Sequence, residues 1–157
     1  MNQEHDHPNI DRRIHPPILL LANILAAFLL NRVLPLPIDF PEVLIWIGYA
    51  LILVGVGLGF SAARQFIQEH TTLDPHGSVT KIVTSGPYRL SRNPIYLGFV
   101  FVLIGSGFVF GTYWGLILTP VLMALLNWLV IQHEEAYLKK KFGETYISYT
   151  SRVRRWL

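Results

Sequence analysis

The sequence predicts an all-α integral membrane protein with about four transmembrane helices and a C-terminal amphipathic helix. Of the 157 residues, 52% are hydrophobic and only 15% are charged, whereas about a quarter of the residues of a soluble domain are charged. The mean hydropathy is +0.40. The apolar residues form long runs, each close to the roughly 20 residues that a helix needs to cross a bilayer.

Four runs have the length and composition of membrane-spanning helices. They cover residues 18–36, 42–60, 95–111 and 113–131. Arg12 and Arg13 precede the first run, as in a signal peptide. However, Asn31-Arg32 stands where a small-residue cleavage site should lie, so we interpret this run as a retained helix. Only a short turn separates the last two runs, which predicts a tight antiparallel hairpin.

The distribution of basic residues predicts the orientation in the membrane. We expect a single membrane domain over residues 1–157. It is composed of a polar N-terminal segment (1–17), two helices (18–60), a loop (61–94), a helical hairpin (95–132) and an amphipathic tail (133–157). The N-terminal segment, the loop and the tail hold most of the Lys and Arg residues, whereas the turn within the hairpin holds none. The positive-inside rule therefore predicts that both termini and the loop are cytoplasmic.

The loop before the third run has features of an anion-binding site. The Gly-Pro pair at 86–87 predicts a turn. Asn93-Pro94 predicts an extended residue followed by a helix with Pro at its first position. The N-terminus of that helix would direct free N–H groups toward the cytoplasmic interface, with Arg92 beside it. An ordinary loop-to-helix junction has the same features, so this pattern alone does not decide its role.

Two adjacent carboxylates, Glu134 and Glu135, directly follow the fourth run. Carboxylates are costly in lipid, and neighbours in a helix lie about 100° apart. We therefore expect Glu134 to face a pocket and Glu135 to face water or Lys139. Further along, apolar residues recur at steps of three and four up to Trp156, which predicts a membrane-surface helix that Gly143 divides in two.

Short segments of the second half occur in a characteristic order. They are VTSGPYR at 83–89, SRNPIYLG at 91–98, the Glu pair at 134–135, Phe-Gly at 142–143, Tyr146, Tyr149 and RVR at 152–154. Each segment is weak alone, but their order and their placement relative to the predicted helices are specific. In these segments the chain resembles the isoprenylcysteine carboxyl methyltransferase and phospholipid methyltransferase family.

The resemblance implies a methyltransferase that uses S-adenosylmethionine as its cofactor at the cytoplasmic edge of the bilayer. It implies adenosine contacts at Lys81, Ile82, Val83 and Tyr88, contacts to the methionine part at Asn93, Pro94 and Tyr96, and a further cofactor contact from Glu134. We expect Glu134, Glu135 and Arg92 to be the catalytic residues, with Arg92 near the carboxylate of the cofactor.

Two departures from the family pattern concern the substrate. Asn93 stands where many relatives have His, which keeps a hydrogen-bonding side chain but removes a titrating one. Val130 stands where the eukaryotic enzymes have a substrate-binding Arg, so we expect different substrate recognition. We take Asn127, Trp128 and His133 as candidate substrate contacts. A carboxylate acceptor needs no general base, whereas an amine must lose a proton, and the sequence leaves this choice open.

Other functions are less well supported. The absence of Cys excludes disulfides and thiolate chemistry. His5, His7 and His15 have no neighbouring ligands, so we expect no metal, and we expect no nucleic-acid partner. Gly55, Gly57 and Gly59 imitate a dinucleotide fingerprint, but inside an apolar helix they indicate close helix packing.

A catalytically silent structural protein on the same scaffold stays an alternative. A small transporter is disfavoured, because no charged residue lies inside the third or fourth run. The partner that we expect is a membrane lipid or a lipid-attached substrate.

Overall fold

The computed structural model describes Pro8 and residues 15–36, 39–69 and 79–157. Within these residues the fold is helical and contains no strand. The elements are α1 (Pro16–Val33), α2 (Val43–Gln68), a 3₁₀ turn (Gly86–Arg89), α3 (Pro94–Val109), α4 (Trp114–Leu126), a π-helical segment (Asn127–Ile131), α5 (Gln132–Phe142) and α6 (Glu144–Thr150). The predicted all-α class, including a short C-terminal helix, is confirmed.

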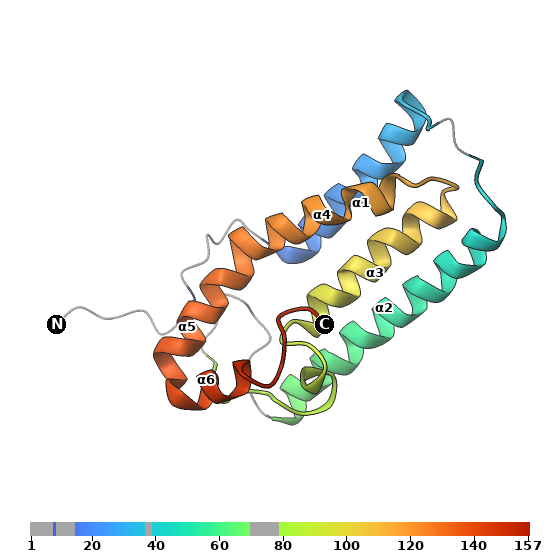
Figure 1. The fold of residues 1–157 in the computed structure, drawn as a ribbon. Coiled ribbons are helices and arrows are strands. Elements are labelled where there is room, and N and C mark those ends of the chain that lie inside the picture. Colours follow the sequence, from blue (N-terminus) through green and yellow to red (C-terminus); the bar gives the residue numbers. More distant parts are fainter. Residues whose placement is uncertain (1–7, 9–14, 37–38, 70–78) are drawn as a thin grey trace.

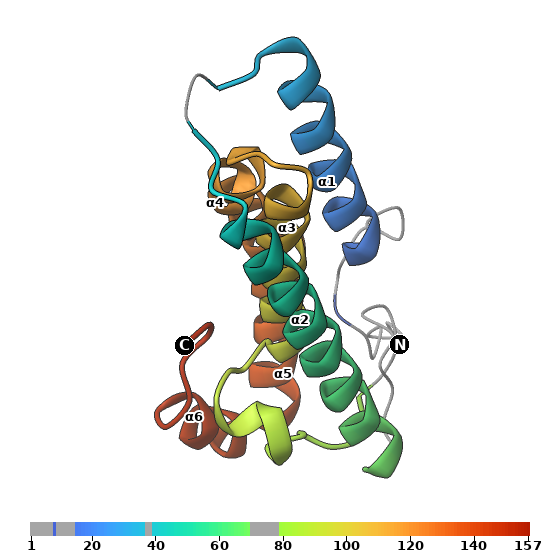
Figure 2. The same ribbon diagram turned by 90° about the vertical axis from the view of Figure 1, so that its right-hand side faces the viewer.

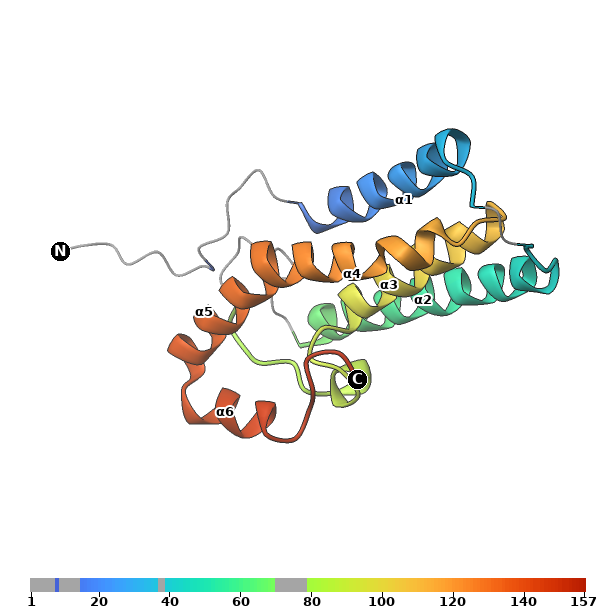
Figure 3. The ribbon, with the colours of Figure 1, turned by 45° about the horizontal axis from the view of Figure 1, so that its top comes forward.

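The first four helices form a long bundle, and α5 and α6 gather at one of its ends (Figure 1). α3 is the central helix, because it contacts α1, α2 and α4. Figure 2 shows α2 passing in front of α3, with α1 beside them. The C-terminus returns to the same end as α5 and α6 (Figure 3).

Three of the described helices are long and apolar enough to cross a membrane. They are Pro16–Val33, Val43–Gln68 and the continuous helix Trp114–Phe142, which includes the π-helical segment. α3 is also apolar but shorter, with 16 residues. Large apolar side chains lie exposed on the outer faces, for example Trp46, with 74% of its surface accessible. Exposed apolar area of this extent suits a lipid environment, and the chain is an integral membrane protein.

The contact between α2 and α3 brings their backbones close together. A Cβ atom at Gly98 would lie 2.5 Å from the carbonyl oxygen of Gly55, and one at Gly105 would lie 2.6 Å from that of Gly48. Close packing is thus confirmed for Gly55. It is wrong for Gly57 and for the glycine at 59, where an added Cβ would meet no atom within 4 Å because that side of α2 faces outward.

The ends of two predicted helices are corrected by the structure. α2 continues to Gln68, so residues 61–68 are helical and not part of the loop. The hydropathy falls there, but Ala62 is fully buried and Phe66 packs against Val83 and Tyr88, which keeps this part of α2 in the fold. Similarly, the fourth helix continues through the π-helical segment into α5 without a break.

Gly143 separates α5 from α6, as predicted, with a φ of +49° that favours glycine. The face of α6 was expected to lie on the membrane surface, and this is wrong for its two tyrosines. Tyr146 and Tyr149 are both 5% exposed, and the Tyr149 hydroxyl donates a hydrogen bond of 2.7 Å to the carbonyl oxygen of Tyr88. This face therefore packs against the loop before α3.

Candidate active site

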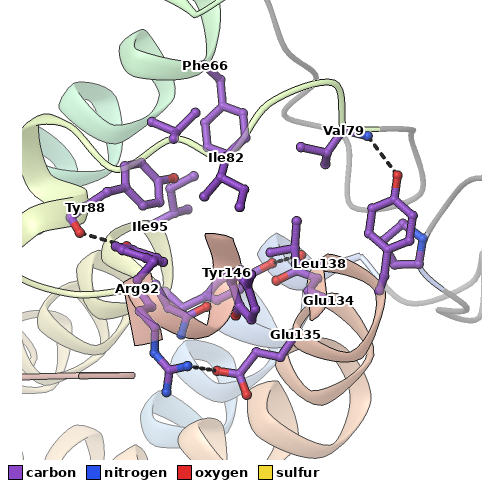
Figure 4. A pocket seen from close by; sticks show the side chains of 16 residues that line it. Phe66, Val79, Ile82, Tyr88, Arg92, Ile95, Glu134, Glu135, Leu138 and Tyr146 are labelled. Atoms are coloured by element: carbon purple, nitrogen blue, oxygen red, sulfur yellow. Dashed lines mark hydrogen bonds and ion pairs between the residues drawn. The ribbon is translucent and has the colours of Figure 1, made fainter. Parts of the chain in front are cut away.

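A cavity lies at the end of the bundle where the last turns of α2, the loop before α3, the start of α3, α5 and α6 meet (Figure 4). It encloses about 880 Å³ of space, including the part open to solvent. The cavity is lined by Pro8, Phe66, Val79, Ile82, Val83, Tyr88, Arg92, Asn93, Ile95, Tyr96, Glu134, Glu135, Tyr137, Leu138, Tyr146 and Tyr149.

The 3₁₀ turn that carries Tyr88 packs against α2 and is hydrogen-bonded to it through Ser85. Gly86 has a φ of +57°, and a Cβ there would lie 3.1 Å from the side chain of Gln65. The Ser85 hydroxyl donates to Oε1 of Gln65 at 2.8 Å. The ring of Tyr88 then meets the ring of Phe66 edge to face, with centroids 5.6 Å apart. Helix α2 thus holds one aromatic wall of the cavity through the part that hydropathy alone had assigned to the loop.

The start of α3 is held by the end of the chain. The backbone N–H of Asn93 donates to the Ser91 hydroxyl at 3.1 Å. The side-chain amide of Asn93 donates to the carbonyl oxygen of Arg155 at 3.0 Å, and Ser91 donates to the same oxygen at 3.1 Å. Pro94 occupies the first helical position, as predicted, but it is fully buried and does not line the cavity.

Glu134 and Tyr96 join the two segments that the sequence singles out. The Tyr96 hydroxyl on α3 donates a hydrogen bond of 2.9 Å to Oε1 of Glu134 on α5, across 38 positions in the sequence. Both side chains line the cavity. The predicted inward orientation of Glu134 therefore agrees with its position, although its role in binding stays a prediction.

Glu135 also lines the cavity, which differs from the expectation that it faces water or Lys139. Two guanidinium groups hold it there. Nε and Nη2 of Arg155 donate to the two carboxylate oxygens, the first at 3.0 Å, and Nη1 of Arg92 lies 3.2 Å from Oε1. This pairing raises the pKa of Arg155. Glu135 thus lies between two guanidinium groups, with 19% of its side chain exposed. Figure 4 shows its contact with Arg92.

Buried tyrosines surround Arg92. Burial raises the pKa of Tyr146 to about 12, and a hydrogen bond from Arg92 opposes this shift. Burial also raises the pKa values of Tyr88 and Tyr149. These phenols therefore keep their protons at neutral pH, and the Tyr149 hydroxyl donates the hydrogen bond to the Tyr88 carbonyl oxygen. Nε of Arg92 is buried and has no hydrogen-bond partner among the residues that the structure describes.

Several predicted site residues lie outside the cavity lining. Lys81 is exposed and forms an ion pair with Glu69 on α2, while its neighbours Ile82 and Val83 do line the cavity. Asn127 accepts a hydrogen bond of 2.8 Å from Nη1 of Arg155. Trp128 is 63% exposed, and His133 is exposed as well. His15 joins no group of three His, Asp or Glu side chains among the described residues, and His5 and His7 lie outside these residues.

Sequence reasoning missed part of the site. Phe66 lies in the part of the chain that was assigned to the loop. Tyr146 and Tyr149 were assigned to the family pattern and to the apolar face of a membrane-surface helix, and not to the site. Their place on that apolar face was the available signal. No local pattern marks Arg155, because its partners Glu135 and Asn127 lie 20 and 28 positions away.

The residues that form the cavity can be compared with the region that a protein-family model matches. The model of the phospholipid methyltransferase family matches residues 43–145, which extend from the start of α2 into α6. The chain belongs to the phospholipid methyltransferase family. The family resemblance inferred from the sequence is thereby confirmed, and the cavity lies almost wholly within the matched region.

One curated relative is the protein-S-isoprenylcysteine O-methyltransferase B of Arabidopsis thaliana, which is 32% identical over 77 residues. The match covers 46% of this chain and 37% of the relative, so the chain spans little more than a third of that protein. No solved structure shows significant similarity to the chain.

Proposed function

We propose that the chain is an S-adenosylmethionine-dependent methyltransferase that acts at the cytoplasmic membrane face on a lipid or lipid-attached substrate. The observation that carries this proposal is the bond between Tyr96 and Glu134, which unites the two family segments in one cavity. The cavity lies at the end of helices that are apolar enough to cross a membrane, and this position fits an acceptor that reaches the cavity from the bilayer.

The lining of the cavity suits the chemistry of the cofactor. S-adenosylmethionine combines an adenine ring with an ammonium, a sulfonium and a carboxylate. Glu134 offers a negative charge for the cationic groups, and Arg92 offers a positive charge for the carboxylate. The rings of Tyr88 and Phe66 offer apolar faces for adenosine and favour nearby cations. Ile82 and Val83 complete this apolar part.

When bound, S-adenosylmethionine would supply an activated methyl group on a positively charged sulfur, and transfer of this group to the acceptor would leave a neutral thioether. The residues of this chain then act by positioning and by excluding water, which together lower a barrier by several kcal/mol, on the order of 7 or more in favourable cases. Both carboxylate oxygens of Glu135 are paired with guanidinium groups, and the amide of Asn93 is not a base.

Three residues near Glu134 are the proposed contacts or supports for the methyl acceptor, namely Trp128, His133 and Asn127. Trp128 projects from the π-helical segment with most of its surface exposed, just before the helix that carries Glu134. An exposed indole at this level suits contact with a lipid-attached group near the interface. His133 is exposed one position before Glu134 and is kept as a candidate contact for an amine acceptor. Asn127 supports the site through Arg155.

The orientation can be tested with single-cysteine variants, because the natural chain has no Cys. Glu42 and Lys140 are exposed at opposite ends of the bundle. We expect Glu42→Cys to react with a membrane-impermeant maleimide added to intact cells, and Lys140→Cys to react only after the cells are opened. The reverse pattern would place the cavity on the outer face.

The function itself is tested in two stages. Calorimetry on detergent-solubilised protein should detect binding of S-adenosylmethionine and of S-adenosylhomocysteine. Incubation with methyl-tritiated cofactor and a membrane lipid extract should then label a lipid fraction. Binding without labelling of any lipid or lipidated protein would favour the silent scaffold, and absence of binding would refute the proposal.

A further inference from the structure

Arg155 lies beyond the residues that the family model matches, yet it contacts three parts of the site. Its guanidinium holds both oxygens of Glu135 on α5 and, through Nη1, the side-chain oxygen of Asn127 in the π-helical segment. Its carbonyl oxygen accepts hydrogen bonds from Ser91 and Asn93. Its side chain does not line the cavity itself.

The two arginines beside Glu135 contact its carboxylate to different extents. Arg155 binds the carboxylate with two parallel N–H groups, which is the strongest geometry for such a pair. Arg92 reaches only one of the same oxygens, at 3.2 Å. Two guanidinium groups therefore share one carboxylate, and one positive charge is left uncompensated within this cluster. Because Arg155 occupies both oxygens, the surplus charge belongs mainly to Arg92.

Arg92 is the member of the pair that meets the cavity. It lines the cavity with only 16% of its side chain exposed, and its buried Nε has no hydrogen-bond partner among the described residues. A buried N–H of a charged group without a partner is unfavourable. The surplus charge on Arg92 therefore suits a carboxylate in the cavity.

We propose that Arg155 is a positioning residue that limits the contact between Glu135 and Arg92 to one carboxylate oxygen, so that Arg92 can bind the carboxylate of the cofactor. This inference rests on the proposed function. Without Arg155, both oxygens of Glu135 become available to Arg92, and the internal ion pair competes with the ligand. Arg155 thus controls the charge that the cavity presents, although it does not contact the ligand.

The test compares the affinities of S-adenosylmethionine and decarboxylated S-adenosylmethionine, which differ only in the carboxylate. The wild-type protein should prefer S-adenosylmethionine. Arg155→Gln should reduce this preference about tenfold or more, as expected when a charge-assisted hydrogen bond is lost. The matched control is Arg154→Gln, which removes an exposed guanidinium one position away and should keep the preference.

A second substitution separates this role from a merely structural one. The double variant Arg155→Gln, Glu135→Gln should regain the preference for S-adenosylmethionine, because the competing carboxylate is gone. Glu135→Gln alone, which keeps Arg155, should prefer S-adenosylmethionine over the decarboxylated compound at least as strongly as the wild type does. This single variant provides the test if Arg155→Gln does not fold.

The outcomes distinguish the two proposals. If the wild-type protein binds neither compound, the proposed function fails and this inference falls with it. If the wild-type protein binds and prefers the carboxylate, but Arg155→Gln weakens both compounds equally or the double variant shows no recovery, only the role of Arg155 is refuted. A reduced preference in Glu135→Gln refutes it as well.

Discussion

The two regions that hold α3 in place use different chemistry. Against α2, the contact consists of glycines whose backbones touch, as at Gly98 and Gly55. At its N-terminus, α3 is held by polar side chains, including the bond from Tyr96 to Glu134 and the bond from Asn93 to Arg155. The first region depends on shape and tolerates no added atoms. The second depends on charge and on hydrogen-bond donors, so its strength is set by individual polar groups.

The largest effect is expected at the glycine contact. Gly98→Leu places side-chain atoms where a Cβ alone would lie 2.5 Å from the Gly55 carbonyl oxygen. We expect a loss of about 3 kcal/mol or more in the free energy of unfolding, because neither backbone can move without separating the helices. Unfolding in mixed detergent micelles measures this. The control Gly57→Leu adds the same atoms where the surroundings are open, and an equal loss there would contradict close packing as the cause.

The next effect concerns the charge inside the cavity. Glu134→Gln should weaken S-adenosylmethionine binding by about 1.5–3 kcal/mol, as expected for a hydrogen bond to a charged group. Glu135→Gln should weaken it less, because Glu135 is engaged by two arginines and not by the cationic groups of the ligand. Dissociation constants from calorimetry provide the comparison. A larger loss for Glu135→Gln would show that the two carboxylates have exchanged roles.

A smaller effect is expected where α6 meets the loop. Tyr149→Phe removes the hydrogen bond of 2.7 Å to the Tyr88 carbonyl oxygen in a buried position. We expect a loss of about 1 kcal/mol in the free energy of unfolding, with little effect on the α2–α3 contact. Tyr49→Phe is the matched control, because Tyr49 is exposed on α2. If both variants lose the same stability, the tyrosine bond does not hold α6 in place.

The smallest effect on the free energy of unfolding at neutral pH should come from the raised pKa of Tyr146, because this effect appears only at high pH. Since the pKa of Tyr146 is raised to about 12 in the folded state, the unfolded phenol ionises first as the pH increases. Stability is therefore fully present below about pH 10 and falls between pH 10 and 12. Tyr146→Phe should show a shallower fall in the free energy of unfolding over this window. The same slope in both proteins would indicate that Tyr146 is not shielded from water.

Much of the fold could be predicted because its signals are local. The apolar runs predicted the bundle, Pro94 predicted the start of α3, and Gly143 predicted the break before α6. The last turns of α2 were missed because Arg64 and Gln65 lower the hydropathy although the helix continues. Hydropathy reports on the lipid environment and not on helix ends, so a helix that leaves the membrane is cut short.

The site was predictable only in part. Tyr88, Asn93, Tyr96 and Glu134 were named in advance and do line one cavity. The partner of Glu135 was predicted wrongly, because the helical neighbour Lys139 was the only basic residue that spacing could offer. Arg155 reaches Glu135 by the return of the chain end over the start of α3, and such a return leaves no periodic trace in the sequence.

The π-helical segment from Asn127 to Ile131 determines in which direction the side chains that follow it point around the helix axis. A π turn accommodates one more residue than an α turn, so the side chains of α5 keep the angular positions that they would have if the chain were one residue shorter. Loss of one codon within this segment, for example that of Leu129, should therefore leave Glu134 facing the cavity. Loss of one codon within α4 would instead turn α5 by about 100° and carry Glu134 away.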